Sequence, residues 1–209
     1  MKTYTVSVII SSIFVVIGNL IYSIGATDLT FLEIVIATAL AVMLMLAIDA
    51  LVATMLHEFP KLFFKNFMTQ TKFYNANRFP FKVYKKEKFF YEKIGVKKWK
   101  DLLPNKMGMR KDHLEDKNDT NYLSMFIIES CRAEFMHLVS AIVTILPLIL
   151  IPFRYFGIIL PVSIVNISLQ ILPIIVQRYN RPKLMIVQKR ALRQAVKTEE
   201  EIETTSLVG

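Results

Sequence analysis

The segment Glu129–Phe153, ESCRAEFMHLVSAIVTILPLILIPF, places charged side chains directly before a long apolar run. Its first nine residues contain Glu129, Arg132, Glu134 and His137. A helix needs roughly 20 mostly apolar residues to cross a bilayer, and this run supplies most of them. Ionisable groups at such a position are costly unless they have partners and face a protein interior or a wet cavity. The segment therefore predicts a membrane helix with a polar site at its start.

The composition agrees with a membrane protein, since 54% of the 209 residues are hydrophobic and the mean hydropathy is +0.42. Four stretches have the length and apolar character of spans: Thr5–Ile24, Leu32–Met55, Ala133–Phe153 and Phe156–Val176. The first is expected to be a retained span, because only Lys2 precedes it and its apolar run is long for a signal peptide. The sequence thus predicts an all-α, polytopic membrane protein with four transmembrane helices in two hairpins.

Lysine and arginine are concentrated in two places, and this distribution predicts the orientation in the membrane. The net charge is +9; of the 26 basic residues, 16 lie between Pro60 and Asn118 and seven follow Gln177. Cytoplasmic loops carry an excess of basic residues, so both termini and the middle segment of this cell-membrane protein are expected in the cytoplasm. No RNA- or DNA-binding motif accompanies the lysines, and no nucleic-acid partner is predicted.

These patterns divide the chain into four parts. Residues 1–57 are the N-terminal hairpin, and residues 58–128 are a basic cytoplasmic or interfacial segment. Residues 129–182 are the C-terminal hairpin with its polar cluster, and residues 183–209 are a basic and then acidic tail. Within the basic segment, Lys85–Ile94 combines lysines with aromatic rings at roughly helical spacing. This pattern is typical of a short amphipathic helix that contacts membrane lipids.

The predicted topology brings three polar segments to the same side of the membrane. They are Leu56–Pro60 at the end of the second span, Glu129–His137 at the start of the third, and Gln177–Pro182 at the end of the fourth. A shared polar site at the cytoplasmic interface is therefore expected.

Helical geometry leaves two interpretations of the Glu129–His137 segment. At 100° per residue, His137 lies about 80° from Glu129 and about 60° from Glu134, so the three can share one side. A carboxylate beside an imidazole fixes its tautomer and raises its basicity, as a general base requires. The structural alternative consists of two ion pairs, one joining Glu129 to Arg132 and the other joining Glu134 to Arg178 or Arg181.

Other polar groups give weaker signals. Glu134-x-x-His137 has the spacing of carboxylate-bridged metal sites, but those need a second pair and more carboxylates, so no metal is predicted. Cys131 is the only cysteine, which excludes an internal disulfide. Its helix face is turned away from His137, so a passive thiol is expected. Asp49, inside the second span, is expected to pair with a polar group such as Asn19 and to serve packing.

Three blocks of the sequence resemble one known family. They are YEKIGVKKWKDLLP at Tyr91–Pro104, ESCRAEFMH at Glu129–His137 and IIVQRYNRPK at Ile174–Lys183. In this order they are similar to the glycosyl-4,4'-diaponeurosporenoate acyltransferases, small membrane proteins of carotenoid pathways in Gram-positive bacteria. The similarity covers roughly Arg78 to Lys189. It implies transfer of a fatty acyl group to a sugar hydroxyl of a membrane-embedded glycolipid.

The leading hypothesis is therefore an integral-membrane O-acyltransferase that works at the cytoplasmic interface. His137 would take the proton from an acceptor hydroxyl of a lipid or small molecule, and Glu134 or Glu129 would orient its ring. The acyl donor would be acyl-CoA or acyl carrier protein, and no further cofactor is expected. The candidate substrate-binding residues are polar or aromatic groups of the three blocks: Arg132, Gln177, Arg178, Tyr179, Asn180, Arg181 and Trp99.

Two other function classes remain open. In a non-enzymatic lipid-binding or assembly subunit, the polar cluster would be a structural clamp between the hairpins. A small transporter is less favoured, because Asp49 stands alone within the predicted spans.

Overall fold

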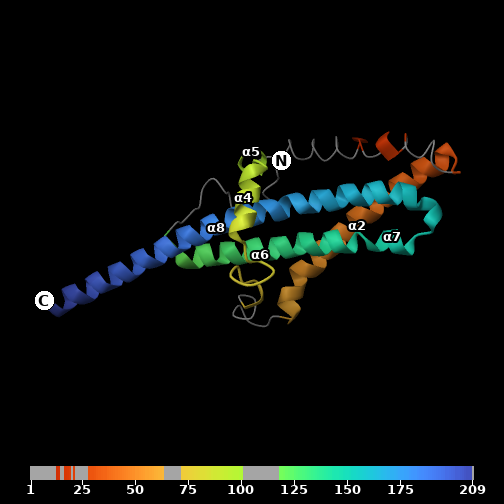
Figure 1. Cartoon of the computed structure of the whole chain (residues 1–209). Coiled ribbons are helices and arrows are strands. Elements are labelled where there is room, and N and C mark those ends of the chain that lie inside the picture. Colours follow the sequence, from red (N-terminus) through yellow and green to blue (C-terminus); the bar gives the residue numbers. More distant parts are fainter. Residues whose placement is uncertain are drawn as a thin grey trace.

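The computed structural model describes residues 13–14, 17–19, 21, 28–63, 72–100 and 118–208; for residues 57–63, 199 and 201–208 only the backbone is described. All regular secondary structure in these residues is helical (Figure 1). The predicted first span, Thr5–Ile24, lies mostly outside the described residues, as do the side chains of His57 and Glu58.

Three described segments are long and apolar enough to cross a membrane: Phe31–Leu56, Thr120–Leu150 and Phe153–Thr198. The first lies in α2 (Phe31–Phe63), the second covers α6 (Thr120–Val143) and α7 (Leu146–Leu150), and the third lies mainly in α8 (Phe156–Val208). A short 3-10 turn, η2 (Phe153–Tyr155), joins α7 to α8. The all-helical membrane class is therefore confirmed, and the second, third and fourth predicted spans all fall on these helices.

Helices α6 and α8 run side by side in opposite directions (Figure 1). α6 begins at Thr120, because the Asp119 side chain caps it by accepting from the backbone N–H groups of Asn121 and Tyr122 at 2.8 and 3.1 Å. α8 has 53 residues and is therefore about 80 Å long, more than twice the hydrocarbon thickness of a bilayer. Both helices thus run through the boundaries predicted at 128/129 and 182/183.

Polar side chains occur at successive levels of the α6–α8 contact. The pairs are Ser124 with Gln188, Ser130 with Arg181, Glu134 with Arg178, His137 with Gln170, and Thr144 with Asn166. The numbers rise along α6 as they fall along α8, as an antiparallel pair requires. We call these five pairs the polar seam. Hydrogen bonds between helices hold membrane bundles together where lipid offers no hydrophobic driving force.

Helix α2 crosses the α6–α8 pair and packs on it with small and apolar side chains (Figure 1). Ala41 and Met45 of α2 form a buried cluster with Ile159 and Val162 of α8. Further from the seam, Asn19 donates a buried hydrogen bond of 2.9 Å to the carbonyl oxygen of Ile158. The contact ties a residue of the N-terminal part to α8.

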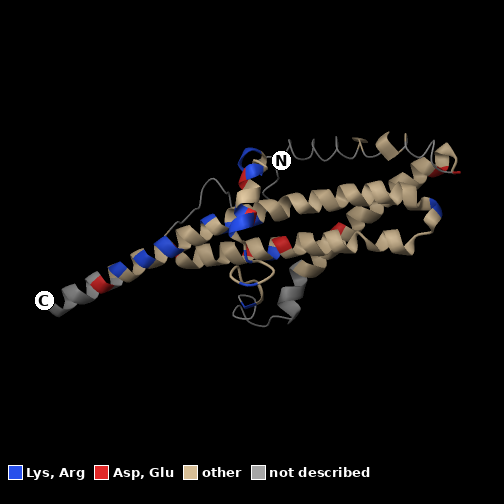
Figure 2. Cartoon of the chain, in the orientation of Figure 1, with Lys and Arg blue, Asp and Glu red and all other residues tan. Residues whose placement is uncertain are grey.

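The described part of the basic segment folds onto α8. It contains α4 (Lys85–Lys93) and α5 (Val96–Trp99), so the predicted short helix is confirmed. Gly95 joins them with φ of +67°, a left-handed conformation that glycine adopts without steric cost. Tyr91 and Val96 pack against Val176 and Tyr179 of α8. Basic residues gather on α4, α5 and the C-terminal half of α8 (Figure 2).

Burial of an apolar side chain near the start of α6 makes a stability prediction. Leu123 is fully buried, and Leu123→Ala should lower the free energy of unfolding by about 2–5 kcal/mol because it leaves a cavity. Met125, on the same turn, is 53% exposed, and Met125→Ala is the matched control with little effect expected. Denaturant unfolding of both variants in detergent micelles measures the difference. Equal losses for the two variants would contradict the burial of Leu123.

Candidate active site

The carboxylate of Glu134 lies between two arginines of α8. Arg178 Nη1 donates to its Oε1 and Arg181 Nη2 donates to its Oε2, each at 2.5 Å. Arg181 is fully buried, and the Glu134 side chain is only 5% exposed. A buried guanidinium is tolerated only with a counter-charge and good hydrogen bonds. We call Glu134, Arg178, Arg181 and their partners the arginine clamp.

The two arginines of the clamp also form hydrogen bonds with the basic segment. Arg178 donates from Nε and Nη2 to Glu87 of α4 at 2.9 and 2.7 Å. Both arginines also donate to backbone carbonyl oxygens just before α4, at distances of 2.7 to 3.0 Å: those of Pro80, Phe81 and Lys82. Arg181 binds Ser130 of α6 as well, through its hydroxyl and its carbonyl oxygen. All three nitrogens of each guanidinium are thus engaged.

Tyr91 of α4 supports the clamp from outside the spans. Its hydroxyl donates to Glu87 Oε2 at 3.2 Å, beside the atoms that Arg178 binds. Burial raises the pKa of the Tyr91 hydroxyl above its usual value of about 10, so the group stays protonated and remains a donor near neutral pH.

These contacts correct one role assigned from the sequence. Glu134 faces the arginines, and Glu129 pairs with Arg132 at 3.0 Å, so neither is the group that orients His137. The structural alternative matches these contacts, because the ion pairs Glu129–Arg132 and Glu134–arginine are both present. It prevails because two full positive charges attract a carboxylate more strongly than a neutral imidazole one turn away does.

His137 is oriented by Gln170 of α8. Its Nδ1 lies 2.7 Å from the amide oxygen Oε1, which can only accept a hydrogen bond. Nδ1 therefore carries the proton, and Nε2 has the free lone pair that a general base needs. This contact lies about one helical turn beyond the clamp, toward the apolar interior. Sequence reasoning missed Gln170, although its spacing of four residues from Asn166 and seven from Gln177 marks a polar stripe on the fourth span.

Asp49 joins the same region from α2. Its Oδ1 accepts from Asn166 Nδ2 at 3.4 Å, and the same nitrogen donates to the Thr144 hydroxyl at 2.9 Å. The predicted pairing of Asp49 with Asn19 is wrong, since Asn19 binds the carbonyl oxygen of Ile158. Asp49 is therefore part of a polar contact among all three described span helices.

Four further predicted site residues, Trp99, Gln177, Tyr179 and Asn180, lie outside the arginine clamp and the His137–Gln170 contact. Trp99 packs beside Tyr179 in the cluster that docks α4 and α5, and the Lys183 ammonium lies 3.8 Å from the centroid of the Tyr179 ring. Gln177 is partly buried and shares the helix face of Gln170, two turns away. Asn180 has a buried Nδ2 without a hydrogen-bond partner among the described residues.

The structure bears on two chemistries that the sequence suggests, a reactive thiol at Cys131 and a metal site. Cys131 is fully buried in an apolar cluster with Tyr74, Phe81 and Ile127. Within the described ranges, no three His, Cys, Asp or Glu side chains come together to hold a metal ion.

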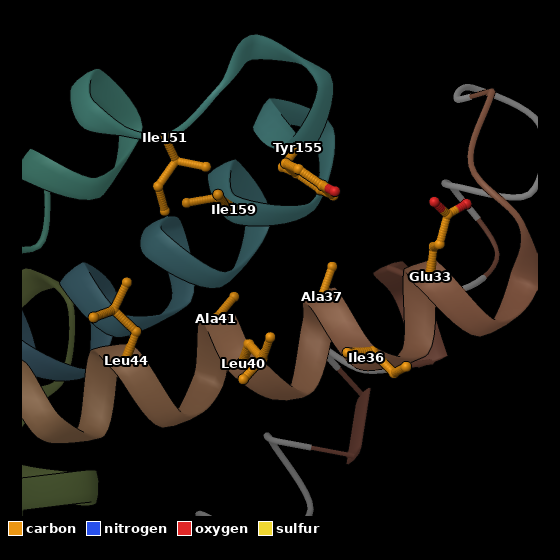
Figure 3. A pocket seen from close by; sticks show the side chains of 9 residues that line it. All are labelled: Glu33, Ile36, Ala37, Leu40, Ala41, Leu44, Ile151, Tyr155 and Ile159. Atoms are coloured by element: carbon orange, nitrogen blue, oxygen red, sulfur yellow. The ribbon is translucent and has the colours of Figure 1, made fainter.

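A cavity of about 400 Å³ lies between α2 and the start of α8 (Figure 3). Its lining is largely apolar and includes Ala37, Leu40, Leu44 and Ile159, while the Glu33 carboxylate lies at one end. Leu44 precedes Asp49 by five residues, or about 7.5 Å along the helix. The cavity thus extends away from the polar seam, within the apolar part of the bundle.

The clamp makes a second stability prediction. Glu134→Gln leaves Arg181 buried without its counter-charge, so the free energy of unfolding should fall by about 3–5 kcal/mol. Glu33→Gln is the matched control, because Glu33 pairs with Arg154 on the exposed surface and should matter little. Chemical unfolding in detergent checks both variants. A small loss for Glu134→Gln would show that the clamp does not hold the fold.

Comparison with models of known protein families gives a match. A search of the curated proteins and one of the solved structures give none. The family model of glycosyl-4,4'-diaponeurosporenoate acyltransferase matches residues 70–190, which include α4, α5, α6, the arginine clamp, His137 and Gln170. This match covers more than half of the chain, and the chain therefore belongs to the glycosyl-4,4'-diaponeurosporenoate acyltransferase family.

Proposed function

We propose that this protein transfers a fatty acyl group from a thioester donor to a hydroxyl of a membrane lipid or glycolipid at the cytoplasmic interface. The observation that carries the proposal is the His137–Gln170 contact, which leaves Nε2 of an imidazole free as a base within a helical bundle. The family is named for an acyltransferase, which supports the reaction class.

In this reaction, His137 Nε2 accepts the proton of the acceptor hydroxyl as its oxygen attacks the thioester carbonyl carbon. The C–S bond then breaks, the acyl group stays on the acceptor oxygen as an ester, and the proton passes to the departing thiolate. Gln170 holds the ring throughout, because its amide oxygen accepts from Nδ1 in both protonation states.

The arginines receive a structural role in this proposal in place of donor binding. Arg178 and Arg181 are engaged by Glu134, Glu87, Ser130 and backbone carbonyl oxygens, so they hold the basic segment over the end of the hairpin. Asn180 keeps the role of a hydrogen-bond donor to a substrate oxygen, since its buried Nδ2 has no partner among the described residues.

The hydrocarbon chain of one substrate would occupy the cavity between α2 and α8 (Figure 3). Its size is within the range of small-molecule sites, and its lining is mostly apolar, as a hydrocarbon requires. The cavity begins about 7.5 Å along α2 from Asp49, so a lipid reacting near the seam would extend its chain in this direction.

The acyl donor would approach the exposed lysines of α4 and α5. Acyl-CoA and acyl carrier protein are anionic, and a surface of one sign of charge raises their local concentration. Six lysines supply this charge: Lys85, Lys86, Lys88, Lys93, Lys97 and Lys98. With both termini in the cytoplasm, as the basic residues favour, this surface would face the soluble donor.

A non-enzymatic subunit is the second candidate, and the engaged arginines favour it. Such a protein would use the clamp to join its parts and would bind lipid in the cavity without chemistry. The two candidates differ in what they require of His137.

The test of the proposed function is His137→Ala in the purified, folded protein. Acyl transfer from a labelled thioester to lipid extracted from the producing membrane should fall by about 10²–10⁴-fold, the usual contribution of a general base. Ser168→Ala is the control, because it also removes a polar group from the bundle, but one that binds only within its own helix. Full activity of His137→Ala would exclude His137 as the base, and absence of transfer in the unmodified protein would favour the non-enzymatic subunit.

The donor surface makes a further prediction. Replacing Lys85 and Lys86 by glutamate should raise KM for the anionic donor and leave kcat unchanged, with an effect that shrinks as salt screens the charges. Replacing the exposed Arg193 and Lys197, near the end of α8, by glutamate is the charge-matched control and should leave KM unchanged. If the α4 variant and the control behave alike at low salt, the donor binds elsewhere.

A further inference from the structure

The basic segment carries phenylalanine side chains that the fold leaves uncovered. Phe79 is 87% exposed, Phe89 is 70% exposed and Phe90 is 53% exposed. Single exposed apolar side chains are ordinary, whereas several large ones gathered in one short segment mark an interaction surface. Lipid accounts for the exposed apolar side chains of α2, α6 and α8, but this segment lies outside the candidate spans. Its exposed rings therefore need an explanation of their own.

Helix α4 presents different side chains to α8 and to its surroundings. Tyr91 is buried against α8, whereas Lys85, Phe89 and Lys93 are exposed and follow one another at intervals of four residues. At 100° per residue, Phe89 and Lys93 each lie about 160° from Tyr91, and Lys85 lies about 120° from it. We call these three residues the outer face of α4. A ring between two ammonium groups is typical of an interfacial helix, which places rings at the acyl boundary and lysines at the phosphates.

The contact between α4 and α8 gives the level of α4 relative to a membrane. Arg154 and Arg178 are 24 positions apart, and no charged residue lies between them. This length of helix rises about 36 Å, slightly more than the hydrocarbon thickness of about 30 Å. Arg178 thus stands at the edge of the hydrocarbon. Tyr91 packs against Val176 and Tyr179, on either side of Arg178, so α4 lies at the level of the lipid headgroups.

Two further observations agree with this level. Figure 1 shows that α4 and α5 run across the direction of α6 and α8. For a helix pair that spans a bilayer, that direction lies in the membrane plane, as an interfacial helix requires. Trp99 and Tyr179 belong to the cluster that docks α4 and α5, and tryptophan and tyrosine are the residues enriched at membrane interfaces.

We propose that the outer face of α4 binds an anionic phospholipid surface, with Phe89 in the acyl boundary and Lys85 and Lys93 at the phosphates. The positive charge and the level of the helix select acidic headgroups as the partner. Phe90, on the flank of the same helix, adds a second ring. This binding does not depend on acyl transfer. An anionic acyl donor drawn to α4 would arrive at the bilayer surface, beside its lipid acceptor.

The first experiment measures whether position 89 contacts lipid. Phe89→Trp in a Trp99→Phe background is reconstituted in vesicles of phosphatidylcholine and phosphatidylglycerol, and lipids brominated near the headgroup end of their acyl chains should quench its fluorescence. Gln194→Trp in the same background is the matched control, because Gln194 is exposed on α8 about 24 Å beyond Arg178 and should not be quenched. Equal quenching at the two positions would overturn the proposal. Shielding of position 89 from aqueous iodide without quenching by bromine would also overturn it, since another protein chain would then cover this face.

The second experiment tests the preference for anionic lipid in the protein with its native tryptophan. Trp99 is the only tryptophan of the chain, so its fluorescence reports on the level of α4. Brominated phosphatidylglycerol should quench it more strongly than brominated phosphatidylcholine at the same mole fraction. Lys93→Gln should lower this preference by about fivefold, the usual effect of one basic residue near an anionic surface, and Lys197→Gln on α8 should leave it unchanged. Equal quenching by the two lipids in the unaltered protein would overturn the role of the lysines.

Discussion

Arg178 and Arg181 of α8 meet the carboxylate of Glu134 from α6, and this contact ties three parts of the chain together. The guanidinium of Arg181 is fully buried, so its charge must be compensated inside the protein. Glu134 supplies the compensation, and the carbonyl oxygens of residues 80–82 take the remaining donors. The requirement to satisfy these donors holds the basic segment on the hairpin, together with the apolar contacts that Tyr91 and Phe81 make with the hairpin helices.

The clamp also fixes the register of the hairpin below it. Because α6 and α8 are continuous through this level, placing Glu134 against Arg178 also places His137 opposite Gln170 and Thr144 opposite Asn166. A shift of one residue would turn these groups toward lipid, where they would have no partners. The charged level and the deeper neutral level of the polar seam therefore depend on each other. The ion pairs of the charged level stabilise the hairpin, and the neutral level contains the oriented imidazole on which the proposed chemistry depends.

Several features of this arrangement were accessible from the pattern of residues. The apolar stretches beginning at Leu32, Ala133 and Phe156 fall on spans, because hydropathy is a property of local composition. The pairing of Glu134 with Arg178 or Arg181 followed from topology and was one of two open interpretations. Gln170 and Asn166 were missed, because two neutral amides hardly alter the hydropathy of a span. The partners of the clamp at residues 80–82 are backbone carbonyl oxygens, which every residue has and no sequence pattern marks.

The length of α8 also depends on tertiary contacts that the sequence pattern does not show. Pro161, Pro173 and Pro182 all lie within α8, although proline usually ends or kinks a helix. The sequence pattern placed the end of the fourth span at Val176, whereas packing of Leu184 and Met185 against α6 accompanies a helix that runs past Pro182. Tertiary contacts can offset the single hydrogen bond that each proline removes, and the pattern of one helix contains no information about its neighbour.

By itself, the sequence determined that the chain is all-helical, which stretches are long and apolar enough to span a membrane, and which charged groups stand at their ends. It determined these because length, hydropathy and charge are fixed by the residues alone. Only the tertiary structure decided that Glu134 pairs with the arginines, that Gln170 contacts His137, and that Asp49 contacts Asn166. The physical reason is that a polar group in an apolar interior binds the strongest partner within reach, and the partners in reach depend on how three helices pack.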